Sequence, residues 1–127
     1  MSGGETAPML RALLAEDEPL ILEWLEELLG ELGCSVVAAA STLAQASRAF
    51  DGVDADVAIL DVHLGNASVF PVAELLRARG IPIIFTTGAA GDPLPAPWKG
   101  YRVLAKPFDQ QHLAAALSVF TQQPSKP

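Results

Sequence analysis

Five short apolar stretches recur along this chain, and segments with helical spacing or turn residues separate them. The five stretches are residues 11–15, 35–39, 57–60, 83–85 and 102–105. Short, continuously apolar runs are typical of strands buried on both faces, and strands that alternate with helices form a parallel sheet. The chain has 127 residues, half of them hydrophobic, which is enough for one domain with its own core. The sequence therefore predicts a single α/β domain.

Local signals place the boundaries of the helices between these strands. Apolar residues at spacings of three and four between Leu20 and Leu32 predict the first helix, whose glutamates face solvent. The expected boundary residues are Pro19 in the first turn, Gly33 and Gly80 at helix ends, and Thr42, Ser68 and Asp109 as N-caps. Pro82 predicts that the fourth strand begins at Ile83.

The segment from Gly88 to Gly100 breaks this pattern. Gly91, Pro93, Pro95 and Pro97 would each interrupt a helix, so most of the segment is expected to be a loop. The helix that normally separates the fourth and fifth strands of such a sheet should therefore be short or irregular.

Charge and cysteine content narrow the class of protein. The chain has 15 acidic and 8 basic residues and a net charge of −7, which disfavours direct binding to nucleic acid. Cys34 is the only cysteine, so no intramolecular disulfide can form. No leader-like segment or long apolar run is present, and a cytoplasmic location without membrane insertion is expected.

Polar residues follow four of the five expected strands at their carboxyl ends. They are Glu16 and Asp17 after the first strand, Asp61 after the third, Thr86 and Thr87 after the fourth, and Lys106 after the fifth. Open α/β sheets build their sites in the crevice beyond these ends. Three convergent carboxylates repel one another unless a divalent cation lies among them, and all-oxygen ligands suit Mg²⁺. The sequence thus predicts a magnesium site in which Lys106 offsets the remaining charge.

This arrangement resembles the CheY-like receiver domain of two-component response regulators. The matching stretches, which lie between residue 10 and about residue 120, are LLAEDEP (13–19), AILDVHL (58–64), IIFTTG (83–88) and KPF (106–108). The resemblance implies a flavodoxin-like, doubly wound, five-stranded parallel sheet of order 2-1-3-4-5. It further implies an N-terminal extension at 1–9, a receiver domain at 10–121 and a flexible tail at 122–127.

The same resemblance implies a role for each polar residue. Asp61 would be the phosphate acceptor, and Asp17 a direct magnesium ligand. Glu16 would reach the metal, and the backbone carbonyl of His63 would be a further ligand.

Two more residues have roles by the resemblance. Thr87 and Lys106 would hold phosphoryl oxygens, and the Lys106–Pro107 bond is expected to be cis. Thr86 is interpreted as structural. Each residue alone has an ordinary structural explanation, and their joint placement favours the functional one.

The chain departs from the receiver pattern at two places. Val103 stands where many receivers carry the Phe or Tyr that turns inward on activation, and Tyr101 is a weak substitute. The FTTG motif and the prolines that follow it are similar to the FAT GUY subgroup of receivers, whose fourth helix is short or mobile. One hypothesis is that phosphorylation orders or displaces residues 88–100 when Thr87 turns toward the phosphoryl group.

The predicted function is that of a stand-alone receiver rather than an enzyme with a separate substrate. Such a domain takes a phosphoryl group from a histidine kinase or a histidine phosphotransfer protein, and it catalyses its own phosphorylation and dephosphorylation with Mg²⁺. It then binds a downstream protein or acts as a phosphate sink, and a phosphorylation-dependent homodimer is compatible with the resemblance.

Two alternatives use similar elements. A phosphatase of the haloacid-dehalogenase type also has an aspartyl nucleophile at a strand end, but it needs a second acid two residues later, where this chain has His63. A flavodoxin-like nucleotide-binding module needs a glycine-rich turn after the first strand, where this chain has three acids, residues 16–18.

Overall fold

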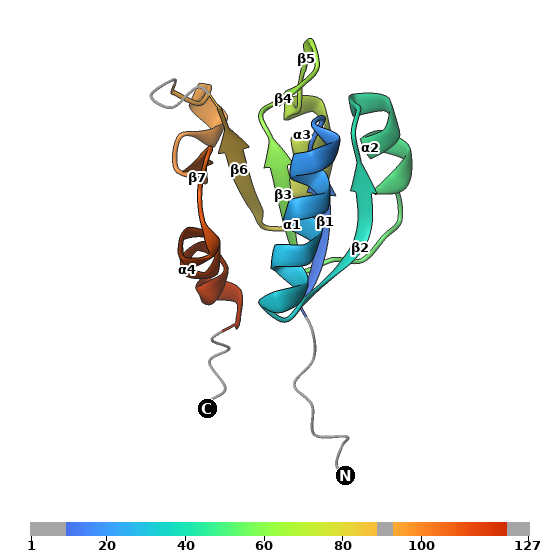
Figure 1. The fold of residues 1–127 in the computed structure, drawn as a ribbon. Coiled ribbons are helices and arrows are strands. Elements are labelled where there is room, and N and C mark those ends of the chain that lie inside the picture. The colour runs from blue at the N-terminus through green and yellow to red at the C-terminus, as the bar shows by residue number, and fades with distance from the viewer. Residues whose placement is uncertain (1–9, 89–92, 122–127) are drawn as a thin grey trace, which may run out of the picture.

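The computed structural model describes residues 10–88 and 93–121 of the chain (Figure 1). The expected N-terminal extension, residues 1–9, and the expected tail, residues 122–127, lie outside the described residues.

A five-stranded parallel sheet forms the centre of the molecule. Its strands, in chain order, are β1 (Leu10–Ala15), β2 (Cys34–Ala40), β3 (Val57–Asp61), β6 (Ile83–Thr87) and β7 (Arg102–Ala105). The spatial order is β2-β1-β3-β6-β7, and every neighbouring pair is parallel. This order is the predicted 2-1-3-4-5 arrangement, and the predicted fold class is confirmed.

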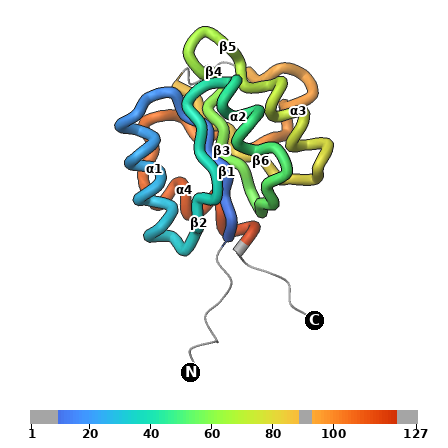
Figure 2. Tube along the Cα trace, turned by 90° about the vertical axis from the view of Figure 1, so that its right-hand side faces the viewer, coloured from blue at the N-terminus to red at the C-terminus, as the bar shows by residue number. Residues whose placement is uncertain are grey.

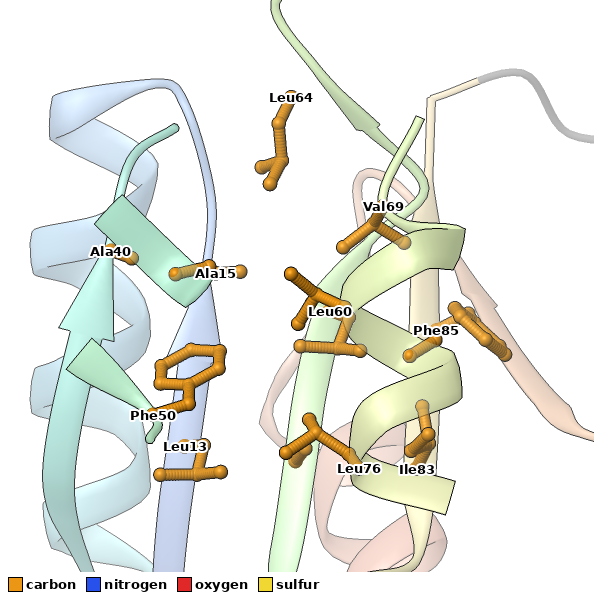
Figure 3. Packing of buried hydrophobic residues seen from close by; sticks show 14 of the residues in the cluster. Leu13, Ala15, Ala40, Phe50, Leu60, Leu64, Val69, Leu76, Ile83 and Phe85 are labelled. Carbon is orange, nitrogen blue, oxygen red and sulfur yellow. The ribbon is translucent and has the colours of Figure 1, made fainter. Parts of the chain in front are cut away.

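Helices cover both faces of the sheet (Figure 2). The four α-helices are α1 (Pro19–Glu31), α2 (Leu43–Ala49), α3 (Phe70–Ala78) and α4 (Gln110–Thr121). Successive residues of a strand point to opposite faces, so Leu13 packs with α2 and α3 while Leu14 packs with α1 and α4. Figure 3 shows part of the first of these two clusters, with Leu13, Leu60 and Phe85 contributed by three different strands. None of the helices in the described residues is long and apolar enough to cross a bilayer.

Most of the expected helix boundaries are confirmed. Pro19 is the first residue of α1, and Gly33 follows the helix with a φ of +86°, a conformation that suits glycine. Thr42 Oγ1 accepts a hydrogen bond from the Gln45 N–H at 3.0 Å, which caps α2. Asp109 Oδ1 accepts from the His112 N–H at 3.0 Å at the start of α4.

The expectation that Ser68 caps the third helix is wrong. Two short antiparallel strands, β4 (His63–Leu64) and β5 (Ala67–Ser68), form a hairpin where the sequence suggested only a loop. The N–H of Val69 donates to the carbonyl of Val62 at 2.9 Å and closes the base of this hairpin. Ser68 therefore still belongs to the hairpin, and α3 begins at Phe70 with Val69 as its N-cap, without a side-chain cap.

A 3-10 turn, Ala96–Trp98, is the one helical element that the described residues contain between β6 and β7. The side chain of Trp98 is 2% exposed, and its ring packs against those of Phe70, Phe85 and Tyr101 at centroid distances of 5.9, 5.5 and 5.0 Å. The Arg77 guanidinium lies 4.8 Å from the centre of the same ring. One buried tryptophan thus covers the part of the sheet that a regular helix would cover.

Candidate functional site

The carboxyl edge of the sheet brings together an ammonium group and two buried carboxylates. Lys106, which follows β7, places its Nζ 3.1 Å from Glu16 Oε1 and 2.9 Å from Asp61 Oδ2. Glu16 follows β1 and Asp61 ends β3, and the parallel pairing of these two strands puts the two acids side by side. Charges from three strands therefore meet at one point, as expected for a site in an open α/β sheet.

Glu16 is fully buried at this point. Its Oε2 accepts a hydrogen bond from the Glu18 N–H at 3.0 Å, while its Oε1 faces Lys106. Burial raises the pKa of Glu16, the two hydrogen bonds oppose that rise, and the negative charge of Asp61 adds to it. Two donors therefore hold the carboxyl group of Glu16 in a buried position.

Lys106 compensates both acids. Burial pulls its pKa down, but the hydrogen bonds to Asp61 and Glu16 outweigh that effect, so the pKa of Lys106 lies above its usual value. Its peptide N–H donates to the Thr87 carbonyl at 2.8 Å, which ties the end of β7 to β6. The Lys106–Pro107 bond is cis, as the resemblance implied.

Asp17 completes a group of three acids. One carboxylate oxygen each from Glu16, Asp17 and Asp61 lies within 4.8 Å of the others, close enough to share one cation. The donors are all oxygens and Asp17 is open to solvent, which suits a cation that keeps bound water, such as Mg²⁺. The residues present therefore fit the metal that the sequence predicted.

The remaining expected site residues border this cluster. The His63 N–H donates to Asp61 Oδ1 at 3.3 Å, and the role of the His63 carbonyl stays a prediction. Thr87 is buried and lines a cavity of about 270 Å³ together with Val62 and His63. Thr86 is also buried, and its carbonyl accepts from the Val62 N–H at 2.9 Å.

The structure modifies the expectation for the segment after β6. Residues 89–92, which form part of the hypothetical switch, lie outside the described residues. The rest of that segment is anchored by the buried Trp98. Val103, at the usual aromatic position, is 37% exposed, whereas Tyr101 packs its ring against Phe85 and Trp98.

Sequence reasoning missed one element of the site, the β4–β5 hairpin. The N–H of Gly65, at its turn, donates to Asp17 Oδ2 at 2.8 Å across 48 positions of sequence. The dipeptide Gly65–Asn66, flanked by the apolar residues Leu64 and Ala67, is a turn signal that could have identified the hairpin. Nothing in the sequence next to either residue indicates that Gly65 contacts Asp17.

Known proteins resemble this chain in sequence and in structure. The model of the response regulator receiver domain family matches residues 12–118. The chain is 32% identical over 125 residues to the phyllosphere-induced regulator PhyR of Methylorubrum extorquens, a match that covers 90% of this chain and 45% of that protein. It thus spans less than half the length of this curated relative.

Two solved structures are similar over nearly their whole length. The solution structure of SdrG from Sphingomonas melonis Fr1 superimposes with a TM-score of 0.78 at 38% identity, covering 91% of this chain and 99% of that one. A CheY-like receiver domain from Methylobacillus flagellatus has a TM-score of 0.77 at 24% identity, covering 88% and 98%, and supports the fold alone. The family match extends over most of the chain and includes the whole carboxyl edge described above. This chain belongs to the response regulator receiver domain family.

Proposed function

We propose that this receiver accepts a phosphoryl group on Asp61 in a magnesium-dependent phosphorelay. The single observation that carries the proposal is the position of the Asp61 carboxylate. It is 4% exposed, ends the central strand β3, and faces Lys106 at 2.9 Å. A buried carboxylate held beside a fixed cation keeps one orientation, which a nucleophile toward phosphorus requires.

The transfer itself exchanges one bond to phosphorus for another. An oxygen of Asp61 forms a bond to the phosphorus of the donor, and the bond between phosphorus and the donor's imidazole nitrogen breaks. The electron pair of that bond leaves with the imidazole. Later attack by water on the acyl phosphate releases inorganic phosphate and restores Asp61, so the chain catalyses both steps on itself rather than on a separate substrate.

The residues around Asp61 have separate tasks in this proposal. Lys106 and the Thr87 hydroxyl hold oxygens of the transferred group. Mg²⁺, held by Glu16, Asp17, Asp61 and the His63 carbonyl, would supply positive charge that offsets the charge on the phosphoryl group. Lys106 is positioned for this task by its contacts with both Glu16 and Asp61.

The partners follow from this chemistry. The donor is a histidine kinase or a histidine phosphotransfer protein, and the output is binding to a downstream protein, self-association, or removal of phosphate from the donor. A phosphotransfer profile against the histidine kinases of the host identifies the donor.

A pair of matched substitutions tests the acceptor. The protein is incubated with Mg²⁺ and acetyl phosphate, and phosphoryl uptake is measured by intact-protein mass spectrometry. Asp61→Asn should abolish uptake, because an amide oxygen is a poor nucleophile toward phosphorus. Asp56→Asn, the same substitution just before the start of β3, should retain it.

The proposal is wrong if Asp61→Asn takes up the label as fast as the wild type. Loss of uptake in Asp56→Asn as well would show that the effect comes from damage to the strand rather than from the acceptor.

A further inference from the structure

The β4–β5 hairpin rises beyond the carboxyl edge of the sheet, next to the acidic site (Figure 1). Leu64 is 4% exposed and anchors the hairpin in the core, at the end of the cluster nearest the site (Figure 3). His63, Gly65 and Asn66 are exposed. The hairpin is thus anchored by one buried residue and exposes its turn to solvent.

Asp17 is held differently from the other two acids of the site. Lys106 contacts both Glu16 and Asp61, whereas the hydrogen bond that orients the Asp17 side chain comes from the Gly65 N–H at 2.8 Å. Within the described residues, Asp17 Oδ2 accepts this bond and Oδ1 accepts none. The proposed direct metal ligand is therefore positioned by the turn of the hairpin.

We infer that Gly65 is a positioning residue for the metal site, and that its backbone N–H fixes the Asp17 carboxylate in the orientation that binds Mg²⁺. The inference rests on the proposed function, because it needs a magnesium site at Glu16, Asp17 and Asp61. Carboxylates that bind metals are commonly held by a hydrogen bond from a neighbouring group, and loss of such a partner typically lowers metal affinity about 10- to 100-fold. A bond between an N–H and an ionised carboxylate is also stronger than one between neutral groups.

The backbone conformation of Gly65 makes this contact sensitive to substitution. Its φ is +63°, in the left-handed region. A Cβ added there meets nothing within 4 Å, so a side chain acts through backbone preference rather than through a clash. Asparagine adopts this conformation readily and should keep the N–H in place. Valine strongly disfavours it and should turn the N–H away from Asp17.

Gly52 provides a matched control. It has a φ of +73°, a Cβ there also meets nothing within 4 Å, and it lies in the loop between α2 and β3, at the opposite edge of the sheet. Valine at Gly52 should therefore cause a comparable backbone strain without any contact with the site.

The experiment measures the affinity of the full chain for Mg²⁺ alone, by titration calorimetry, in the wild type, Gly65→Val, Gly65→Asn and Gly52→Val. Gly65→Val should weaken Mg²⁺ binding roughly 10-fold. Gly65→Asn should stay within about two-fold of the wild type, and so should Gly52→Val. Amide exchange at Gly65 in the metal-free protein provides a second measurement, and Asp17→Ala should accelerate it.

The outcomes separate the inference from the proposed function. If the wild type binds Mg²⁺ and Gly65→Val binds it equally well, the positioning role is refuted and the metal site stands. Equal weakening in Gly52→Val would also refute it, because the effect would then be general strain. A wild type that binds no Mg²⁺ would overturn the metal site and the inference together.

Discussion

The same two strands, β1 and β3, carry charged residues at both of their ends, and the two ends are built in opposite ways. Just before β3, at the amino edge, Asp56 receives hydrogen bonds from the Arg11 guanidinium at 3.1 Å on each carboxylate oxygen. At the carboxyl edge, Glu16 and Asp61 are like charges that share the cation Lys106. One register, in which Ala12 pairs with Val57 and Ala15 with Leu60, brings both pairs of residues together.

The two ends differ in how their charged side chains are compensated. The Arg11–Asp56 pair is exposed and joins one acid to one base. The side-chain hydrogen bond from Arg11 lowers the pKa of Asp56. At the other end, burial raises the pKa of Glu16, and compensation comes from a different strand. The amino edge therefore suits stability alone, whereas the carboxyl edge keeps excess negative charge that a metal can offset.

The largest effect should come from Lys106→Met. Without the ammonium group, Glu16 and Asp61 remain as two buried carboxylates that have both lost their ion pair with Lys106. The free energy of unfolding in urea, measured without Mg²⁺, should fall by about 3 kcal/mol.

Lys99→Met, at an exposed lysine, is the control and should change the unfolding free energy far less. A loss in Lys106→Met no larger than in this control would contradict the view that the carboxyl edge depends on one cation.

Mg²⁺ should stabilise the carboxyl edge by an intermediate amount. Because only the folded chain brings the three acids together, the unfolding free energy of the wild type should rise by about 1.4 kcal/mol at a Mg²⁺ concentration ten times the dissociation constant. Asp17→Asn should remove most of this rise, while Asp54→Asn, at an exposed acid near the amino edge, should keep it. A melting temperature that does not respond to millimolar Mg²⁺ in the wild type would argue against the site.

The smallest effects should be two pH dependences of opposite sign. The lowered pKa of Asp56 means that its pair with Arg11 contributes stability above about pH 4, and that this contribution is lost as the pH falls through the lowered value. Because the pair is exposed, Asp56→Asn should cost only about 0.5 kcal/mol at neutral pH.

Glu16 should behave in the opposite way. The pKa of Glu16 is raised in the folded protein. Its contribution to the free energy of unfolding is therefore fully present below the pKa of the unfolded chain, and it declines as the pH rises through the raised pKa. Urea unfolding of the wild type, Asp56→Asn and Glu16→Gln between about pH 3 and about pH 7 measures both trends. For each variant, the loss of unfolding free energy relative to the wild type is plotted against pH. If both losses change with pH in the same direction, the contrast between the edges is wrong.

Several features could be predicted because they depend on short-range pattern. The apolar runs identified the five strands of the sheet, and Pro82 placed the start of β6 at Ile83. The prolines between residues 93 and 97 indicated an irregular crossover before β7, where the described residues form a 3-10 turn. The position of Trp98 within a cluster of aromatic rings was not predictable, because the other three rings come from α3, β6 and the residue before β7.

The hairpin shows why one local prediction failed. Ser68 has the side chain of an N-cap, but the Val69–Val62 backbone hydrogen bond keeps the chain in the hairpin until Val69. A cap contributes about 1 kcal/mol, which is comparable to a backbone hydrogen bond, so the side chain alone did not decide where α3 begins.

By itself, the sequence determined the succession of strands and helices along the chain and the set of polar residues at the carboxyl edge. Both depend on periodicity and strand ends, which are local properties of the chain. Only the tertiary structure decided which of these groups bond to each other. Lys106 pairs with Glu16 across 90 positions, and Gly65 donates to Asp17 across 48. A hydrogen bond requires its two atoms to lie within a few tenths of an ångström of the right distance, and that placement depends on how β1, β7 and the hairpin pack rather than on the spacing of residues along the chain.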